Sequence, residues 1–168
     1  DDTPATETYP LALHDALPIF AGALLLPLTA QAVPNLWSAD SGQGVTEYRI
    51  ANTAGSVFTV NCTGNPDEDN TLQHSVAVSP VGGQSVDSHF STEVYIVVVI
   101  DDQQYGIPSS LGWRNADNAW FAFIEAIGRA TQFDVYLNDR HVGVWEPRQK
   151  NVQKVLADIS SCATTHRE

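Results

Sequence analysis

The sequence predicts an α+β fold: a mainly antiparallel β-sheet or small sandwich with two packed helices, at about 118–130 and 151–162. Short apolar runs with strand-like alternation, separated by Gly, Pro, Asn and Asp turns, occupy the chain from about residue 45 to 107. Two patterns at helical spacing follow, on either side of one more hairpin pattern. Strands followed by helices, rather than strict strand–helix alternation, indicate the α+β class.

The first strands are predicted from alternation and turn residues. Phe58, Val60 and Cys62 share one face of their run, which places Cys62 toward the interior. The elements expected here are an extended entry at 37–44, strands at 47–52 and 56–62 around the turn Thr53-Ala54-Gly55, a loop at 63–70, a strand at 73–79 and a loop at 80–88.

The middle of the chain holds its most apolar run, EVYIVVVI at 93–100. A β-branched run without alternation is typical of a central strand covered on both faces. Asp101-Asp102 is expected to turn the chain into a partner strand at 103–107, and 108–117 to form a loop.

Two helices and a hairpin complete the expected fold. Residues 118–130 place Trp120, Phe121, Ile124 and Ile127 at helical spacing, with Asp117 or Asn118 as the predicted N-cap. Strands at 132–137 and 141–146 are expected to pair around Asn138-Asp139. The apolar stripe of 151–162 indicates the last helix.

The front of the chain is expected to lie outside the folded domain. Residues 20–32 (FAGALLLPLTAQA) form a short apolar stretch that ends in the small-x-small pattern of a signal peptidase site, so we predict a signal-peptide remnant cleaved after Ala32. Residues 1–19 carry no Lys or Arg. They resemble the conceptual translation of a common sequencing adapter, with which they share the run LHDALPI, and the resemblance implies a non-native, disordered segment.

Residues 33–168 are therefore expected to form a single globular domain, exported to the periplasm or the cell exterior. The chain has a net charge of −12, and residues 33–168 keep 16 acidic against 8 basic residues, a net −8. This charge argues against nucleic acid and anionic membrane surfaces as partners, and no membrane span is expected after signal cleavage. It favours a basic protein as partner, although an acidic surface that simply maintains solubility explains it as well.

Two cysteines, Cys62 and Cys162, are expected to form a disulfide, because an exported protein meets an oxidising compartment. A metal pair or a reactive thiol is the alternative, but neither cysteine lies in a CxxC motif or beside a histidine.

Candidate site residues are few, and no catalytic residue, metal site or cofactor is predicted. The histidines form no zinc-binding spacing, and no GxSxG, P-loop or GxGxxG motif occurs. An exposed Trp beside an Arg can anchor an interface, so Trp113 and Arg114 are one candidate binding surface. The acidic turn Asp67-Glu68-Asp69 is the other, with a solvated turn as its alternative.

Three function classes follow. The first is an exported binding domain of unknown ligand that favours a basic partner. The second is a small exported hydrolase whose site is assembled in space around His89 or His141, and the third is an accessory subunit of a cell-envelope assembly. The layout of an early Trp, an early Cys and a late Cys resembles small exported bacterial proteins of the invasion-associated type. That resemblance implies export but no functional residues.

Overall fold

The computed structural model describes residues 33–91 and 93–164 of the chain. The predicted adapter-like segment, the signal-peptide remnant with its cleavage point, and His166 lie outside these residues. Within the described ranges, no helix is long and apolar enough to cross a membrane.

Two antiparallel sheets form the domain, so the predicted α+β class is confirmed. The first sheet has the order β1-β2-β3-β4-β5, and the second has the order β7-β6-β8-β9. The strands of the first sheet are β1 (Ser38–Gly42), β2 (Val45–Ala51), β3 (Val57–Thr63), β4 (Ser75–Ser79) and β5 (Val86–Asp87). Those of the second are β6 (Ile96–Ile100), β7 (Gln103–Gly106), β8 (Phe133–Leu137) and β9 (Arg140–Trp145).

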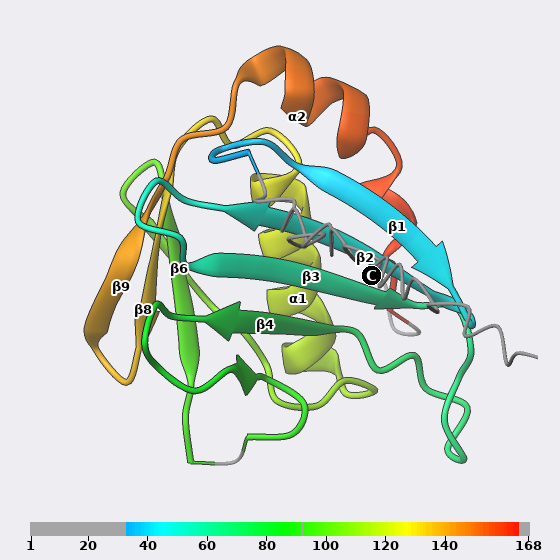
Figure 1. Ribbon diagram of the computed structural model, residues 1–168. Coiled ribbons are helices and arrows are strands. Elements are labelled where there is room, and N and C mark those ends of the chain that lie inside the picture. The colour runs from blue at the N-terminus through cyan, green and yellow to red at the C-terminus, as the bar shows by residue number, and fades with distance from the viewer. Residues whose placement is uncertain (1–32, 92, 165–168) are drawn as a thin grey trace, which may run out of the picture. The chain divides into compact units, whose positions relative to one another are not determined.

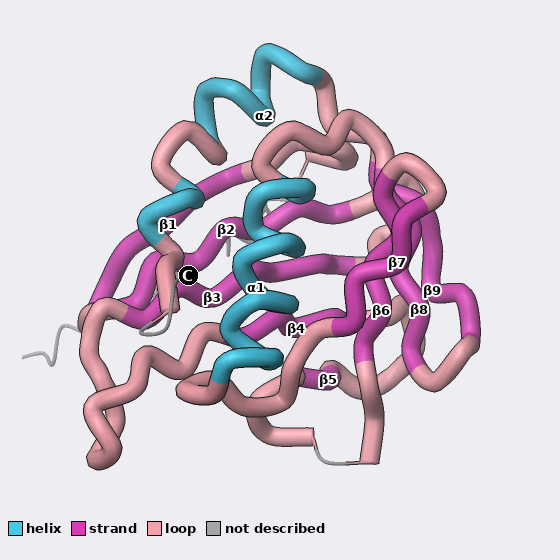
Figure 2. Tube along the Cα trace, turned by 180° about the vertical axis from the view of Figure 1, so that it is seen from behind, coloured by secondary structure: helices cyan, strands magenta, loops and turns pink. Residues whose placement is uncertain are grey.

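Two helices complete the fold: α1 (Arg114–Ile127) and α2 (Gln149–Val155), with a short 3-10 turn, η1, at Ile159–Ser161. Figure 2 shows α1 crossing one face of the first sheet, beside the second sheet, whereas α2 lies past the β1 end of that sheet. Figure 1 shows the opposite face of the first sheet, on which neither α1 nor α2 lies.

Aromatic residues hold the two sheets together. Phe58 on β3 lies 5.1 Å from Phe133 on β8, and Phe133 stacks at 5.5 Å on Trp145 of β9, measured between ring centroids. These three side chains are almost wholly buried. Buried aromatic pairs add about 0.5–1.5 kcal/mol each beyond the area they bury, so this cluster fixes the sheets against each other.

Several predicted boundaries are wrong. The helix expected at 118–130 begins at Arg114, and its N-cap residue is Trp113, which makes no side-chain cap. Asp117 instead lies inside the first turn, where its Oδ1 accepts the N–H of Gly112 at 2.9 Å. The helix expected at 151–162 is interrupted after Val155 and resumes only as η1, so Cys162 follows a 3-10 turn.

The central strand also differs from its prediction. β6 is an inner strand, as expected, but only Ile96, Val98 and Ile100 are buried, while Val97 and Val99 are half-buried. The β-branched residues on both faces of β6 thus reflect strand propensity. Only the face that carries Ile96, Val98 and Ile100 is completely buried. In addition, the predicted loop at 80–88 contains the two-residue strand β5.

Candidate functional site

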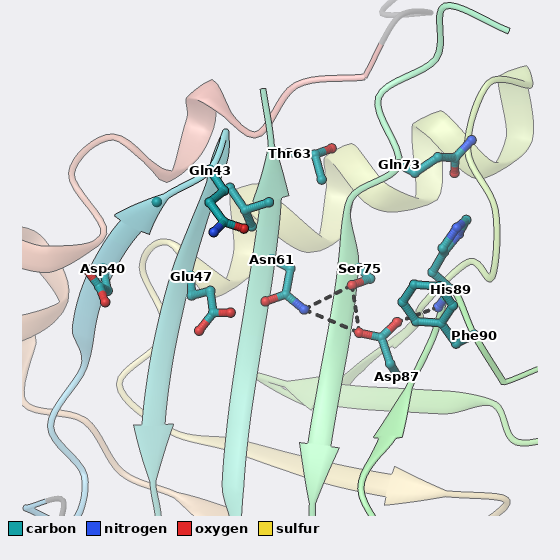
Figure 3. Close-up of a pocket in the computed structure, with 12 residues that line it drawn as sticks. Asp40, Gln43, Glu47, Asn61, Thr63, Gln73, Ser75, Asp87, His89 and Phe90 are labelled. Carbon is teal, nitrogen blue, oxygen red and sulfur yellow. Dashed lines mark hydrogen bonds between the residues drawn. The ribbon is translucent and has the colours of Figure 1, made fainter. Parts of the chain in front are cut away.

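A groove of about 700 Å³ runs over the open face of the first sheet (Figure 3). Its walls come from all five strands of that sheet and from the segments that flank them. The lining residues are Asp40, Gly42, Gln43, Val45, Glu47, Asn61, Thr63, Gln73, Ser75, Asp87, His89 and Phe90.

The floor of the groove is one row of side chains set by strand register. Asp40 pairs with Glu47, Glu47 with Asn61, and Asn61 with Ser75, across β1 to β4. Side chains alternate between the two faces of a strand, so the row faces outward while the neighbouring apolar positions, such as Val60, face the core. This polar row is what distinguishes the outer face from the inner one.

Asp87 on β5 closes the row at its far end through a compact hydrogen-bond network (Figure 3). Its Oδ2 accepts the Ser75 hydroxyl at 2.9 Å and the Asn61 amide at 3.3 Å, and its Oδ1 accepts the backbone N–H of His89 at 2.8 Å. Ser, His and Asp thus meet in the groove. However, the Ser75 hydroxyl donates to a carboxylate rather than to the imidazole, so the set is not arranged as a nucleophile and its base.

The groove is acidic. Asp40, Glu47 and Asp87 line it, and among the residues that the structure describes no Lys or Arg does. On the same face of β2, the guanidinium of Arg49 binds Glu47 at 2.9 Å. A concave surface with carboxylates of one sign attracts cations.

The two surfaces predicted from the sequence are brought together at one end of the groove. Gln73, which lines the groove, donates from Nε2 to the carboxylate of Asp67 at 2.9 Å. The same side chain accepts the N–H of Leu111 at 3.1 Å, in the loop that precedes Trp113. Gln73 therefore connects both candidate surfaces to the groove.

Asp67 itself is engaged within its own loop. Its Oδ1 accepts the N–H groups of Asp69 and Thr71 at 3.0 and 2.8 Å. The hydrogen bond from Gln73, and then the one from Thr71, hold the pKa of the Asp67 carboxyl below its usual value. Asp67 thus shapes the turn, and it is exposed, as are Glu68 and Asp69.

Trp113 is 55% exposed, and Arg114 beside it is exposed as the first residue of α1. The preceding Gly112 has φ +102°, and a Cβ there would come within 2.8 Å of Thr71. Close packing of the two loops therefore requires a glycine at this position.

A buried histidine lies behind the groove. His74 is 3% exposed, follows Gln73 and precedes Ser75, and its ring stacks on Trp120 at 5.5 Å. Its Nδ1 accepts the N–H of Thr63 at 3.0 Å, and its Nε2 lies 2.9 Å from the carbonyl of Ala163. Both ring nitrogens are thus occupied by backbone groups, and burial lowers the pKa of the imidazole.

The other histidines differ. His89 lines the groove, and its Nδ1 is buried without a hydrogen-bond partner among the described residues. His141 lies on the second sheet, with Nε2 at 2.7 Å from Asp134 Oδ1 on an exposed surface. Within residues 33–91 and 93–164, no group of three or more His, Cys, Asp and Glu side chains could hold a metal ion.

The predicted disulfide is present between Cys62 and Cys162, with 5.2 Å between the Cα atoms. It ties the end of β3 to the segment after η1, next to the two backbone groups that His74 binds.

Sequence reasoning missed Glu47, Asn61, Ser75, Asp87 and Phe90 as site residues. Phe90 lies in the turn after β5 and gave no signal of its own. The signal of the other four was the polar half of each alternating strand, which is indistinguishable from an ordinary solvated sheet face. Only the register between strands places Glu47, Asn61 and Ser75 in one row, with Asp87 at its end.

Comparison with known proteins gives one family. Residues 35–156 match the sequence model of the YfjT family. The chain is 49% identical over 144 residues to the uncharacterised protein YfjT of Escherichia coli K12, covering 86% of this chain and 92% of that protein. It is 48% identical over 145 residues to the uncharacterised protein YkfB of the same strain, covering 86% and 93%. No solved structure matches it.

Proposed function

The chain belongs to the YfjT family, and for this member we propose the function of an exported binding domain whose groove takes a basic segment of a partner protein. The observation that carries the proposal is the row of acidic and amide side chains along the groove. Asp40 and Glu47 stand on one side of the row and Asp87 on the other.

Electrostatics support a basic ligand. Two unit charges 4 Å apart attract by about 4 kcal/mol at the effective dielectric of a protein surface, and a concave site concentrates the potential. A cationic segment laid along the groove would meet carboxylates contributed by β1, β2 and β5. An acidic ligand would meet the same charges as repulsion, which gives the groove its specificity.

Export is part of the proposal and is supported by two features. The apolar stretch at 20–32 has the composition and ending of a signal peptide. The disulfide between Cys62 and Cys162 suits an oxidising compartment, periplasmic or extracellular. Fractionation of cells expressing the native gene, with a thiol-labelling gel shift of the exported fraction, tests this part. Recovery of a reduced protein in the cytosol would refute it.

The groove is tested by calorimetric titration with a hexapeptide of alternating Lys and Arg at low salt. The double variant D40N/E47Q is expected to weaken binding about three- to tenfold, because it removes two exposed charges. The matched control D101N/D102N removes two charges from the turn between β6 and β7, on the other sheet, and should change little. Equal losses in the two variants would mean that net charge, not the groove, binds the peptide.

An exported hydrolase is the second candidate, because His141 and Asp134 form a 2.7 Å imidazole–carboxylate contact. Hydrolysis of p-nitrophenyl acetate, lost in H141Q and in D134N, would support it. Activity that is absent, or that survives both substitutions, would remove it.

A further inference from the structure

The hydrogen-bond network at Asp87 consumes the donors of the groove floor. Asn61 uses its Nδ2 hydrogens on Ser75 Oγ at 3.0 Å and on Asp87 Oδ2 at 3.3 Å. The Ser75 hydroxyl donates its hydrogen to the same Oδ2 at 2.9 Å. No donor of Asn61 or Ser75 is left for a ligand.

What the floor offers is therefore a set of acceptors. Asn61 Oδ1 has no protein partner among the described residues. Asp87 Oδ2 already accepts two hydrogen bonds, while Oδ1 accepts one, from the backbone N–H of His89. Each carboxylate oxygen can accept about two hydrogen bonds, so Asp87 keeps one free position, on Oδ1.

One free position decides between the two cationic side chains. A guanidinium binds a carboxylate best through two parallel N–H···O bonds that use both oxygens, and Asp87 Oδ2 is saturated. An ammonium group can bind Asp87 with a single N–H, which needs only the one free position on Oδ1. It can direct its other hydrogens elsewhere, for example to Asn61 Oδ1.

Phe90 adds an aromatic surface at the same end of the groove (Figure 3). It is 82% exposed, and its ring packs edge-on against His89 with 4.9 Å between centroids. An exposed aromatic face beside a carboxylate attracts a compact cation.

We infer that the Asp87 end of the groove is a subsite for a primary ammonium, contributed by a lysine side chain of the basic partner, with Phe90 as its aromatic wall. The inference rests on the proposed function and narrows it. It assigns Asp87, Phe90 and Asn61 to specificity, and leaves Asp40 and Glu47 as general attractors of positive charge.

The experiment compares hexalysine, hexaarginine and hexa-trimethyllysine peptides by calorimetric titration of the full chain. Hexalysine is expected to bind about fivefold more tightly than hexaarginine, although arginine is usually the better carboxylate ligand. The trimethylated peptide keeps its charge but has no side-chain N–H, so it should bind more weakly than hexalysine. Spermidine tests whether the ammonium group comes from a free polyamine rather than from a protein. If spermidine bound as tightly as hexalysine, the assignment to a lysine of a partner protein would be overturned.

Two variants test the residues. F90A, at an exposed position, should weaken hexalysine several-fold without changing the unfolding midpoint. N61A frees a position on Asp87 Oδ2, so it should raise the affinity for hexaarginine and bring the two peptides to equal binding. Equal binding to the unmodified protein, or an unchanged preference in N61A, would overturn this inference alone. Binding of no cationic peptide at all would overturn the proposed function as well.

Discussion

His74 accepts the backbone N–H of Thr63 through Nδ1, at 3.0 Å. An acceptor nitrogen carries no proton, so the imidazole is neutral and its hydrogen lies on Nε2, directed at the carbonyl of Ala163. Thr63 follows Cys62 and Ala163 follows Cys162. The His74 ring therefore hydrogen-bonds to both residues that directly follow the disulfide cysteines, Thr63 and Ala163.

This arrangement predicts loss of stability in acid. Protonation of Nδ1 would place its N–H against the N–H of Thr63, two donors without an acceptor between them. Desolvation by burial accordingly holds the pKa of folded His74 below its usual value of about 6.5. Asp117 on α1 is the charged group that opposes this shift. The unfolded chain thus binds the proton more readily, so His74's contribution is complete above about pH 6.5 and is lost as the pH falls toward the folded pKa.

Urea unfolding between pH 5 and 8 measures this effect. H74N keeps an acceptor for Thr63 but leaves the Ala163 carbonyl unpaired. We expect it to lower the free energy of unfolding by about 1–3 kcal/mol at pH 7.5 and to flatten the pH dependence. H141N is the control: the contact of His141 with Asp134 would strengthen on protonation, so its loss should not flatten the decrease of stability in acid. If the free energy of unfolding of H74N depended on pH as steeply as that of the parent protein, groups other than His74 would be responsible.

The disulfide should contribute strongly to stability. It closes a separation of 100 residues, and constraining so long a loop in the unfolded chain is worth about 4–5 kcal/mol at most. C62A/C162A should therefore unfold at a much lower urea concentration than the oxidised protein. Dithiothreitol should lower the midpoint of the parent protein and leave that of the variant unchanged; a parent protein indifferent to reduction would contradict the prediction.

Arg49 is expected to compete with a basic ligand for Glu47. In R49Q the carboxylate loses its partner at 2.9 Å, so the affinity for the alternating Lys–Arg peptide should rise about two- to fivefold. R129Q breaks a comparable exposed pair with Glu125 on α1, far along the chain from the groove strands. It makes the same change in net charge and is the matched control. Similar gains in both variants would point to net charge alone.

Gln73 should hold the Asp67 and Trp113 loops in place. Q73A removes hydrogen bonds to Asp67 and Leu111, and we expect cleavage between residues 63 and 72 by a non-specific protease to accelerate. Loss of stability of about 1–2 kcal/mol should accompany it. Q104A, on the exposed strand β7, serves as the control. Unchanged cleavage in Q73A would show that the loops are held by other contacts.

The sequence predicted the fold class and most strands because turn residues and alternation are local signals. The hairpin at Asn138-Asp139, for example, has positive φ at both residues, as such turns need. The N-cap of α1 was missed because Asp117 binds Gly112 from inside the first turn, a contact that depends on the chain before the helix. The break after Val155 lacks a Gly or Pro signal.

The groove was out of reach for another reason. Asp87 hydrogen-bonds to Asn61 and Ser75, which lie 26 and 12 positions earlier in the chain. Nothing local in the sequence fixes which strands become neighbours. The exposed Trp113 was foreseen as a candidate surface, but its link to the groove passes through Gln73, a residue with no distinguishing pattern.

The covalent loop closed by Cys62 and Cys162 also determines how the domain carries mechanical load. Tension between Val33 and Ala163 would pass along β1, β2 and β3 to Cys62, cross the disulfide, and bypass every residue from 63 to 161. Asp40, Glu47 and Asn61 lie on the loaded path, whereas Ser75, Asp87 and His89 are shielded from it. The hydrogen bond from Asn61 to Ser75 spans that boundary. Pulling on the domain would therefore part β3 from β4 and divide the groove across its row of side chains.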